Sequence, residues 1–198
     1  MINYPGGTPY HGKETKKRAK KKSEAELSIS SANRGMSFEA DINASNDYYR
    51  EKGVCLVTKR PTPINIVKVD YSKGAMITHA YFEAQSTTDY NGVYKSRYID
   101  FEAKNTKNKT SFPLSNITKH QIEHLKKVLH HGGIAFFIIN FESLSKVYLL
   151  DASYVIDFYE KGERKSIPYD CFVTNGIEIE QGYSPRVDYI KAIEKKYF

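Results

Sequence analysis

The segment that most constrains the fold of this chain is Ile134–Phe141, a strongly apolar run of strand length. A short run of this kind is typical of a strand buried within a sheet. Lys146–Leu150 follows closely and is the expected neighbour of this strand. The segment before it, from about Thr118 to His131, repeats apolar residues at helical spacing and ends at two glycines. Helices and strands mixed in this way within one unit predict an α/β or α+β domain.

Helical and strand-like patterns also mark most of the remaining chain. The other predicted elements are a helix over 37–52 that Gly53 ends, a short strand over 54–58, strands over Ile64–Tyr71 and Met76–Glu83 that form a hairpin through the turn 72–75, a polar loop over 85–88, a strand over 94–104, a helix over 151–160 and a C-terminal helix after Pro185. No internal repeat is present, so the pattern favours a single domain over a repeat array.

Length and composition limit the class of protein further. The chain has 198 residues, the size of one ordinary domain. No apolar run reaches the roughly 18 residues that a membrane-spanning helix needs, and no apolar stretch near Met1 indicates a secretory signal. The two cysteines, Cys55 and Cys171, do not form a closely spaced pair. We therefore expect a cytoplasmic protein without a disulfide framework.

The basic charge is concentrated at the N-terminus. The formal net charge is +7, and the first 30 residues carry seven Lys or Arg and only three Glu. This segment has few apolar residues and is predicted to be a flexible basic arm over 1–32, followed by a domain over 33–198. Basic charge indicates a polyanionic partner such as DNA. The alternative is a tail that only keeps the protein soluble.

The residues that point to chemistry lie on the predicted strand that contains Tyr98–Lys104. Because side chains alternate along a strand, Asp100, Glu102 and Lys104 face the same side. Two carboxylates with water oxygens suit Mg²⁺, and a nearby ammonium can stabilise charge that develops on a phosphate. With Asp89 upstream, this spacing matches the PD-(D/E)xK nuclease pattern. Taken alone, the Glu-x-Lys triplet is more typical of a solvated strand face than of an active site.

Longer motifs give that triplet a context. They are Asn33-Arg34-Gly35-Met36, Lys59-Arg60-Pro61-Thr62-Pro63, the segment 86–92 (STTDYNG), the segment 98–114 (YIDFEAKNTKNKTSFPL), His120-Gln121-Ile122-Glu123-His124 and Pro185-Arg186-Val187-Asp188-Tyr189-Ile190. Together they closely resemble the RecU family, the Holliday junction resolvases of low-GC Gram-positive bacteria. The resemblance runs from about Asn33 to the C-terminus, with Asn3-Tyr4-Pro5 in addition.

The resemblance implies a homodimeric, Mg²⁺-dependent endonuclease with a restriction-endonuclease-like core, a mixed sheet flanked by helices. It implies that the metal ligands are Thr87, Asp89, Glu102 and Gln121, and that Mn²⁺ can substitute for Mg²⁺. It also implies that Lys104 stabilises the transition state. The catalytic residues would then be Asp89, Glu102 and Lys104. The hairpin over 64–83 would be the family's stalk, which enters the centre of a four-way DNA junction. RecA is an implied partner, and the site of action is the nucleoid in the cytoplasm.

The sequence also allows other interpretations of its motifs and of its function. His120-x-x-Glu123-His124 has the spacing of an inverted zinc-peptidase motif but lacks an evident third ligand. The protein could instead bind junctions and modulate RecA with a secondary nuclease activity, or cut duplex DNA as a restriction-type nuclease. Tyr81 and Phe82 could stack on bases or pack in the core, and Glu39 could approach the site or act only on the helix dipole. Lys107 and Lys109 are expected to contact phosphate.

Overall fold

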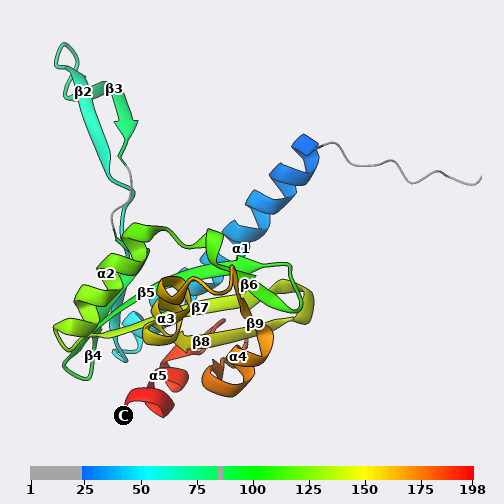
Figure 1. The fold of residues 1–198 in the computed structure, drawn as a ribbon. Helices are drawn as coiled ribbons and strands as arrows, with labels where there is room; N and C mark the ends of the chain where they lie inside the picture. The colour runs from blue at the N-terminus through cyan, green and yellow to red at the C-terminus, as the bar shows by residue number, and fades with distance from the viewer. Residues whose placement is uncertain (1–23, 84–86) are drawn as a thin grey trace, which may run out of the picture.

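A six-stranded mixed sheet forms the centre of the computed structural model, which describes residues 24–83 and 87–198 (Figure 1). The strand order is β1-β4-β5-β7-β8-β10, with β1 at Leu56–Lys59, β4 at Tyr90–Tyr94, β5 at Arg97–Thr106, β7 at Ile134–Phe141, β8 at Lys146–Asp151 and β10 at Ile177–Glu178. Strands β5 and β7 run parallel, and the other neighbouring pairs are antiparallel. A parallel pair needs a crossover connection, which contains the helix α2, Lys119–His130.

Helices cover both faces of this sheet. One hydrophobic cluster joins the first face to α1 (Glu24–Glu51) and α5 (Tyr189–Tyr197). A second cluster joins the other face to α2, α3 (Ala152–Lys161) and α4 (Tyr169–Asn175). The small strands β6 (Ser111–Pro113) and β9 (Ser166–Pro168) pair beside the second face, and two short 3₁₀ turns occupy Leu114–Asn116 and Glu142–Leu144. The predicted α/β class, a mixed sheet flanked by helices, is confirmed.

Strand β5 differs from its neighbours in what it presents to the two faces. Strands β7 and β8 place apolar side chains on both sides, as strands buried between two helical layers do. On β5, Ile99 and Phe101 join the first cluster, whereas the alternate positions hold Asp100, Glu102 and Lys104. Asp100 and Glu102 are fully buried. The polar face of β5 therefore lies inside the fold rather than on a solvated surface.

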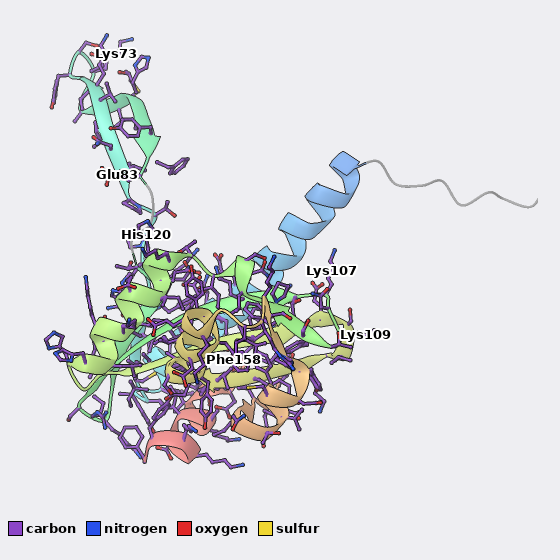
Figure 2. The ribbon with its side chains drawn as sticks, in the orientation of Figure 1. Lys73, Glu83, Lys107, Lys109, His120 and Phe158 are labelled. Atoms are coloured by element: carbon purple, nitrogen blue, oxygen red, sulfur yellow. The ribbon has the colours of Figure 1, made fainter. Side chains whose placement is uncertain are left out.

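The hairpin predicted over 64–83 is confirmed as β2 (Ile64–Asp70) and β3 (Met76–Phe82), which pair with each other in a separate sheet. It projects far from the body, with Lys73 at its outer end and Glu83 at its inner end (Figure 2). Every residue of β3 is exposed. Because Tyr81 and Phe82 are 56% and 77% exposed, the interpretation of these two residues as core residues is wrong.

Most of the other predicted elements are present. The strands at 134–141 and 146–150 and the helices at 118–131 and 151–160 are confirmed within a residue or two. Thr118 caps α2 through a reciprocal capping box with Gln121, and Asp151 caps α3 by accepting from the Ser153 N–H. Gly53 ends α1 with a positive φ of 65°, as its position predicted.

Two element predictions were wrong. The helix expected to begin at Ser37 begins at Glu24, so the boundary predicted between residues 32 and 33 falls within α1, and residues 24–32 are helical rather than part of a flexible arm. The strand expected over 94–104 begins only at Arg97, as β5, and the preceding strand β4 was not predicted; the two strands are joined by a turn at Lys95-Ser96 with φ of 45° and 61°. That turn lacks the glycine or asparagine that usually signals it. The part of the arm over 1–23 and the first two residues of the predicted loop 85–88 lie outside the described residues.

No helix in the part of the chain that the structure describes is long and apolar enough to span a membrane.

Candidate active site

Glu102 is the centre of the site that the sequence predicts. Its carboxylate is fully buried on β5, with Oε2 accepting a hydrogen bond from the Asp89 backbone N–H at 3.0 Å. Oε1 lies 2.8 Å from Lys104 Nζ. The β4–β5 register, which pairs Tyr90 with Phe101, brings the residue before β4 alongside Glu102. The structure therefore brings together Asp89, Glu102 and Lys104, the three predicted catalytic residues.

Burial changes the acidity of this carboxyl. Desolvation raises the pKa of Glu102 from 4.5 to about 8, the Lys104 ammonium opposes this rise, and the nearby Asp89 carboxylate adds to it. Oε1 is buried and accepts no hydrogen bond of good geometry, although the ammonium is close. A buried carboxylate with a weakly satisfied oxygen and a second carboxylate beside it is a donor set that suits a hard divalent cation.

A cavity of about 240 Å³ opens beside these residues. Its lining contains Glu39 from α1, Asp89, and Lys104 with Asn105 from β5. The sequence allowed Glu39 either to approach the site or to act only on the helix dipole, and the structure places it at the site. Its side chain pairs with Lys59 Nζ at 2.5 Å. The cavity thus has both acidic and basic groups on its wall.

The other two predicted metal ligands, Thr87 and Gln121, hydrogen-bond to Thr88 and Thr118. Gln121 is buried at the start of α2, where its Oε1 accepts from the Thr118 N–H at 3.0 Å. Thr87 Oγ1 donates to the Thr88 carbonyl at 3.4 Å, and Thr87 lines a different cavity, of about 340 Å³, against α2. The assignment of Thr87 and Gln121 as ligands therefore stays a prediction.

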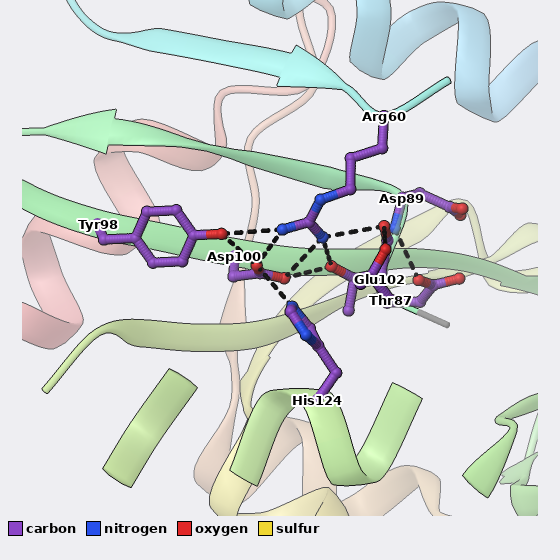
Figure 3. A network of polar contacts seen from close by, with 8 residues as sticks. Arg60, Thr87, Asp89, Tyr98, Asp100, Glu102 and His124 are labelled. Atoms are coloured by element: carbon purple, nitrogen blue, oxygen red, sulfur yellow. Dashed lines mark hydrogen bonds and ion pairs between the residues drawn. The ribbon is translucent and has the colours of Figure 1, made fainter. Parts of the chain in front are cut away.

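Asp100 occupies the same face of β5 but has a different role from Glu102. Its buried carboxylate is bonded to Arg60 Nη2 at 2.7 Å, Tyr98 Oη at 2.7 Å, His124 Nε2 at 2.9 Å and the Thr88 hydroxyl (Figure 3). Burial alone would raise the pKa of Asp100, but these hydrogen bonds, with that of His124 the largest, lower it below its usual value. Asp100 is thus a satisfied structural anion and not an open ligand.

Arg60 and Thr88 were not singled out by sequence reasoning. Both lie in irregular segments, so no periodicity marks them, and their only signal was their presence in two of the motifs that carry the family resemblance. Only the folded chain shows that they meet at Asp100, which is 40 residues from Arg60 and 12 from Thr88.

The zinc-peptidase alternative gains no support from the geometry. His124 Nε2 is already engaged with Asp100, while His120 and Glu123 are exposed on α2. Across residues 24–83 and 87–198, no three His, Cys, Asp or Glu side chains are grouped to hold a metal ion. A metal at Asp89 and Glu102 would therefore need further oxygen ligands from other residue types, from water or from DNA.

Comparison with known proteins identifies the family. Residues 33–195 match the family model described as recombination protein U. A protein of Geobacillus sp. strain WCH70 named Holliday junction resolvase RecU is 51% identical over 203 residues, which cover 100% of this chain and 98% of the relative. The protein of that name from Geobacillus kaustophilus is 50% identical, with the same coverage.

A further relative of the same name, from Bacillus cereus strain AH820, is 52% identical over 172 residues, which cover 84% of this chain and 86% of the relative. Among solved structures, Archaeoglobus fulgidus Hjc, described as a Holliday junction resolvase, aligns with a TM-score of 0.40 and 12% identity, covering 69% of this chain and 94% of that one. On the family match and the identity to these curated relatives, this chain belongs to the RecU family, recombination protein U.

Proposed function

We propose that this chain is a Holliday junction resolvase, a divalent-metal-dependent endonuclease that makes paired symmetric nicks in four-way DNA junctions during recombination and repair. The observation that carries the proposal is the buried Glu102 carboxylate between the Asp89 N–H and the Lys104 ammonium. Membership of the RecU family and the names of its relatives supply the substrate class.

Asp89 and Glu102 would hold the metal ion, with Thr87 and Gln121 as further ligands. We propose Mg²⁺, with Mn²⁺ able to substitute, because these oxygen donors suit hard cations. The amide oxygen of Gln121 has two lone pairs, so its hydrogen bond from Thr118 leaves one for a metal. When bound, the ion would supply positive charge beside the scissile phosphate and lower the pKa of a water molecule.

The chain's own residues would then divide the remaining work. Lys104 is anchored at Glu102, faces the cavity that Asp89 lines, and would stabilise the charge that develops on the phosphate. Metal charge would keep Glu102 ionised at neutral pH, against the effect of burial. The mixed character of the cavity wall therefore suits a phosphodiester that must be bound and then released.

Selection of a junction over duplex needs an element outside the core, because phosphate contacts carry no information about branching. The β2–β3 hairpin is long, projects from the body and presents Lys68, Lys73, Tyr81 and Phe82 on exposed positions (Figure 2). We propose that it enters the open centre of the junction, where these aromatic rings can stack on bases. Lys107 and Lys109 are also exposed and would contact the backbone.

Paired nicks require two active sites, so the proposed active form is a homodimer. Contact with RecA is proposed on the family resemblance alone. Analytical ultracentrifugation with and without a four-way junction tests the dimer, and surface plasmon resonance with immobilised RecA tests the second partner.

The test of function compares a mobile junction, a fixed junction and a linear duplex of the same sequence, with Mg²⁺ and with EDTA. We expect paired nicks in the mobile junction, little cutting of the duplex, and no cutting in EDTA. Asp89→Ala should abolish cleavage while junction binding in EDTA persists, and Glu163→Gln, at an exposed loop position, is the matched control. Equal cutting of duplex would favour a restriction-type nuclease, and binding without cutting would favour the RecA-modulating alternative.

A further inference from the structure

Arg60 lies at the point where the chain leaves the central sheet for the hairpin. Strand β1 ends at Lys59, and β2 begins at Ile64 after two prolines. The chain returns from the hairpin to the body through the segment that contains Thr88 and Asp89. At the foot of the hairpin, the Glu83 N–H donates to the Pro63 carbonyl at 3.0 Å. The two ends of the hairpin are thus joined at a residue three positions after Arg60.

The Arg60 backbone contacts the residue that carries the first catalytic carboxylate. Its N–H donates to the Asp89 carbonyl at 2.7 Å, while the Asp89 N–H donates to Glu102 Oε2 at 3.0 Å. The backbone of Asp89 is therefore held on one side by the foot of the hairpin and on the other by the buried glutamate.

The Arg60 side chain adds a second connection to the same segment. Nη1 donates to the Thr88 carbonyl at 3.1 Å and to the Thr88 hydroxyl at 2.6 Å, and Nη2 donates to Asp100 Oδ2 at 2.7 Å and to Tyr98 Oη at 2.8 Å. The Arg60 side chain is 19% exposed, and the Asp100 side chain is fully buried. His124 from α2 completes the group by contacting the same Asp100 oxygen.

These contacts need the planar fork of arginine. One guanidinium reaches a backbone carbonyl, a hydroxyl, a carboxylate and a phenol through two nitrogens in a fixed plane. A lysine ammonium keeps the charge but presents its donors from a single atom, so it cannot reach this set of acceptors. The Arg60 side chain is mostly buried and both terminal nitrogens are hydrogen-bonded within the protein, which favours a role inside the protein over a contact with DNA phosphate.

From this geometry we propose that Arg60 is a positioning residue that locks the foot of the β2–β3 hairpin to the Thr88-Asp89 segment, so that the placement of the hairpin and the placement of the Asp89 carboxylate are coupled. This inference rests on the proposed nuclease function for its kinetic consequence but not for its structural one. A contact made by the hairpin in the centre of a junction would reach Asp89 through this lock.

The test uses full-length Arg60→Lys and Arg60→Gln, with Arg164→Gln, at an exposed arginine in the loop after α3, as the matched control. Amide hydrogen exchange in EDTA measures the lock without activity. We expect the Asp89 and Glu83 amides to exchange about tenfold faster or more in both Arg60 variants, with the α2 and β7 amides unchanged. Mn²⁺ binding, measured by electron paramagnetic resonance, should weaken in the same variants.

The kinetic arm separates positioning from DNA binding. Both Arg60 variants should keep the parent's junction affinity in EDTA within about threefold, while the single-turnover cleavage rate falls about tenfold to a hundredfold, because small misplacements of reacting groups are costly. If junction affinity falls as far as the rate, Arg60 is a phosphate contact and the proposal is wrong. Parent-like amide exchange at Asp89 in folded Arg60→Lys would also overturn it.

The two proposals fail in different ways. If the parent does not cut junctions but Arg60→Lys still loosens the Asp89 amide, the nuclease function is wrong and the lock stands. If Arg60→Gln does not fold, Tyr98→Phe, which removes the hydroxyl that links Arg60 and Asp100, must still increase exchange at Asp89. An unchanged Asp89 amide in that variant would contradict the proposal.

Discussion

At the scale of single residues, Glu102 is the side chain whose acidity folding changes most clearly at the site. A carboxyl whose pKa is higher in the folded state binds its proton more tightly there than in the unfolded chain. Its contribution to stability is therefore fully present below the unfolded value near 4.5 and is lost as the pH rises to about 8. Lys104 limits this loss, because its ammonium favours the charged form.

The first prediction follows from the upward direction of the Glu102 pKa shift. Glu102→Gln keeps the shape of the side chain but cannot ionise, so in EDTA it should stabilise the protein more at pH 9 than at pH 5. Urea unfolding at the two pH values measures the difference, and Glu163→Gln should leave the parent's pH dependence unchanged. A free energy of unfolding that varies with pH equally in Glu102→Gln and the parent would contradict the assignment of the raised pKa to Glu102.

A second residue-scale prediction separates chemistry from binding. Lys104→Gln removes the ammonium beside Glu102 and should lower the single-turnover cleavage rate by about a hundredfold or more, with junction affinity in EDTA retained. Lys109→Gln should affect binding and not cleavage, because an exposed lysine contributes to DNA affinity. The slope of log affinity against log salt should fall by about 0.9. The cleavage rate at saturating DNA should stay unchanged. Loss of cleavage in both variants to the same extent would remove the distinction.

At the scale of elements, the hairpin is structurally separable from the sheet. Strands β2 and β3 pair only with each other among the described strands, and every β3 residue is exposed. The hydrophobic clusters of the core contain none of their side chains among their described members. Removing the outer part of the hairpin should therefore cost the core little.

The third prediction uses this independence. Replacing Lys68–His79 with an Asn-Gly turn should leave the thermal unfolding of the core close to that of the parent and preserve duplex binding. Preference for a four-way junction over duplex should fall by about tenfold or more, because this variant lacks the element that we propose reads the branch. Competition binding with both DNAs measures the preference, and an unchanged ratio would show that the hairpin does not recognise junctions.

At the scale of the whole molecule, the basic charge of residues 1–23 is expected to contribute to DNA affinity. The first 23 residues contain seven Lys or Arg and one Glu, so deleting them removes most of the formal net charge of +7. Because α1 begins at Glu24, a deletion of 1–23 leaves this helix intact. Clustered lysines attract DNA through counterion release and without sequence preference.

The fourth prediction is that deletion of 1–23 weakens junction and duplex binding equally. Each lost phosphate contact should reduce the slope of log affinity against log salt by about 0.9. The preference for junctions and the cleavage rate at saturating DNA should not change. Titrations at several salt concentrations measure the slope, and an unchanged slope would assign the segment to solubility alone.

Local patterns in the sequence were sufficient to predict most of the elements and the polar face of strand β5. The spacing of Glu102 and Lys104 requires only the two-residue repeat of a strand, and the cap at Thr118 requires only residues within one turn. The β4–β5 turn was missed because Lys95-Ser96 adopts positive φ without the usual residues. Strand alternation and helix capping act over a few residues, so the spacing of residues in the sequence can reveal them.

Only the tertiary structure shows which of these residues lie in contact and how deeply they are buried. The register of β4 on β5 placed Asp89 at Glu102, and burial between two helical layers raised the pKa of that glutamate. The fold also brought Arg60 to Asp100 across 40 residues of sequence, which made Asp100 a structural anion and not a ligand. Desolvation and long-range hydrogen bonds depend on what surrounds a side chain in space, and no local period in the sequence records those surroundings.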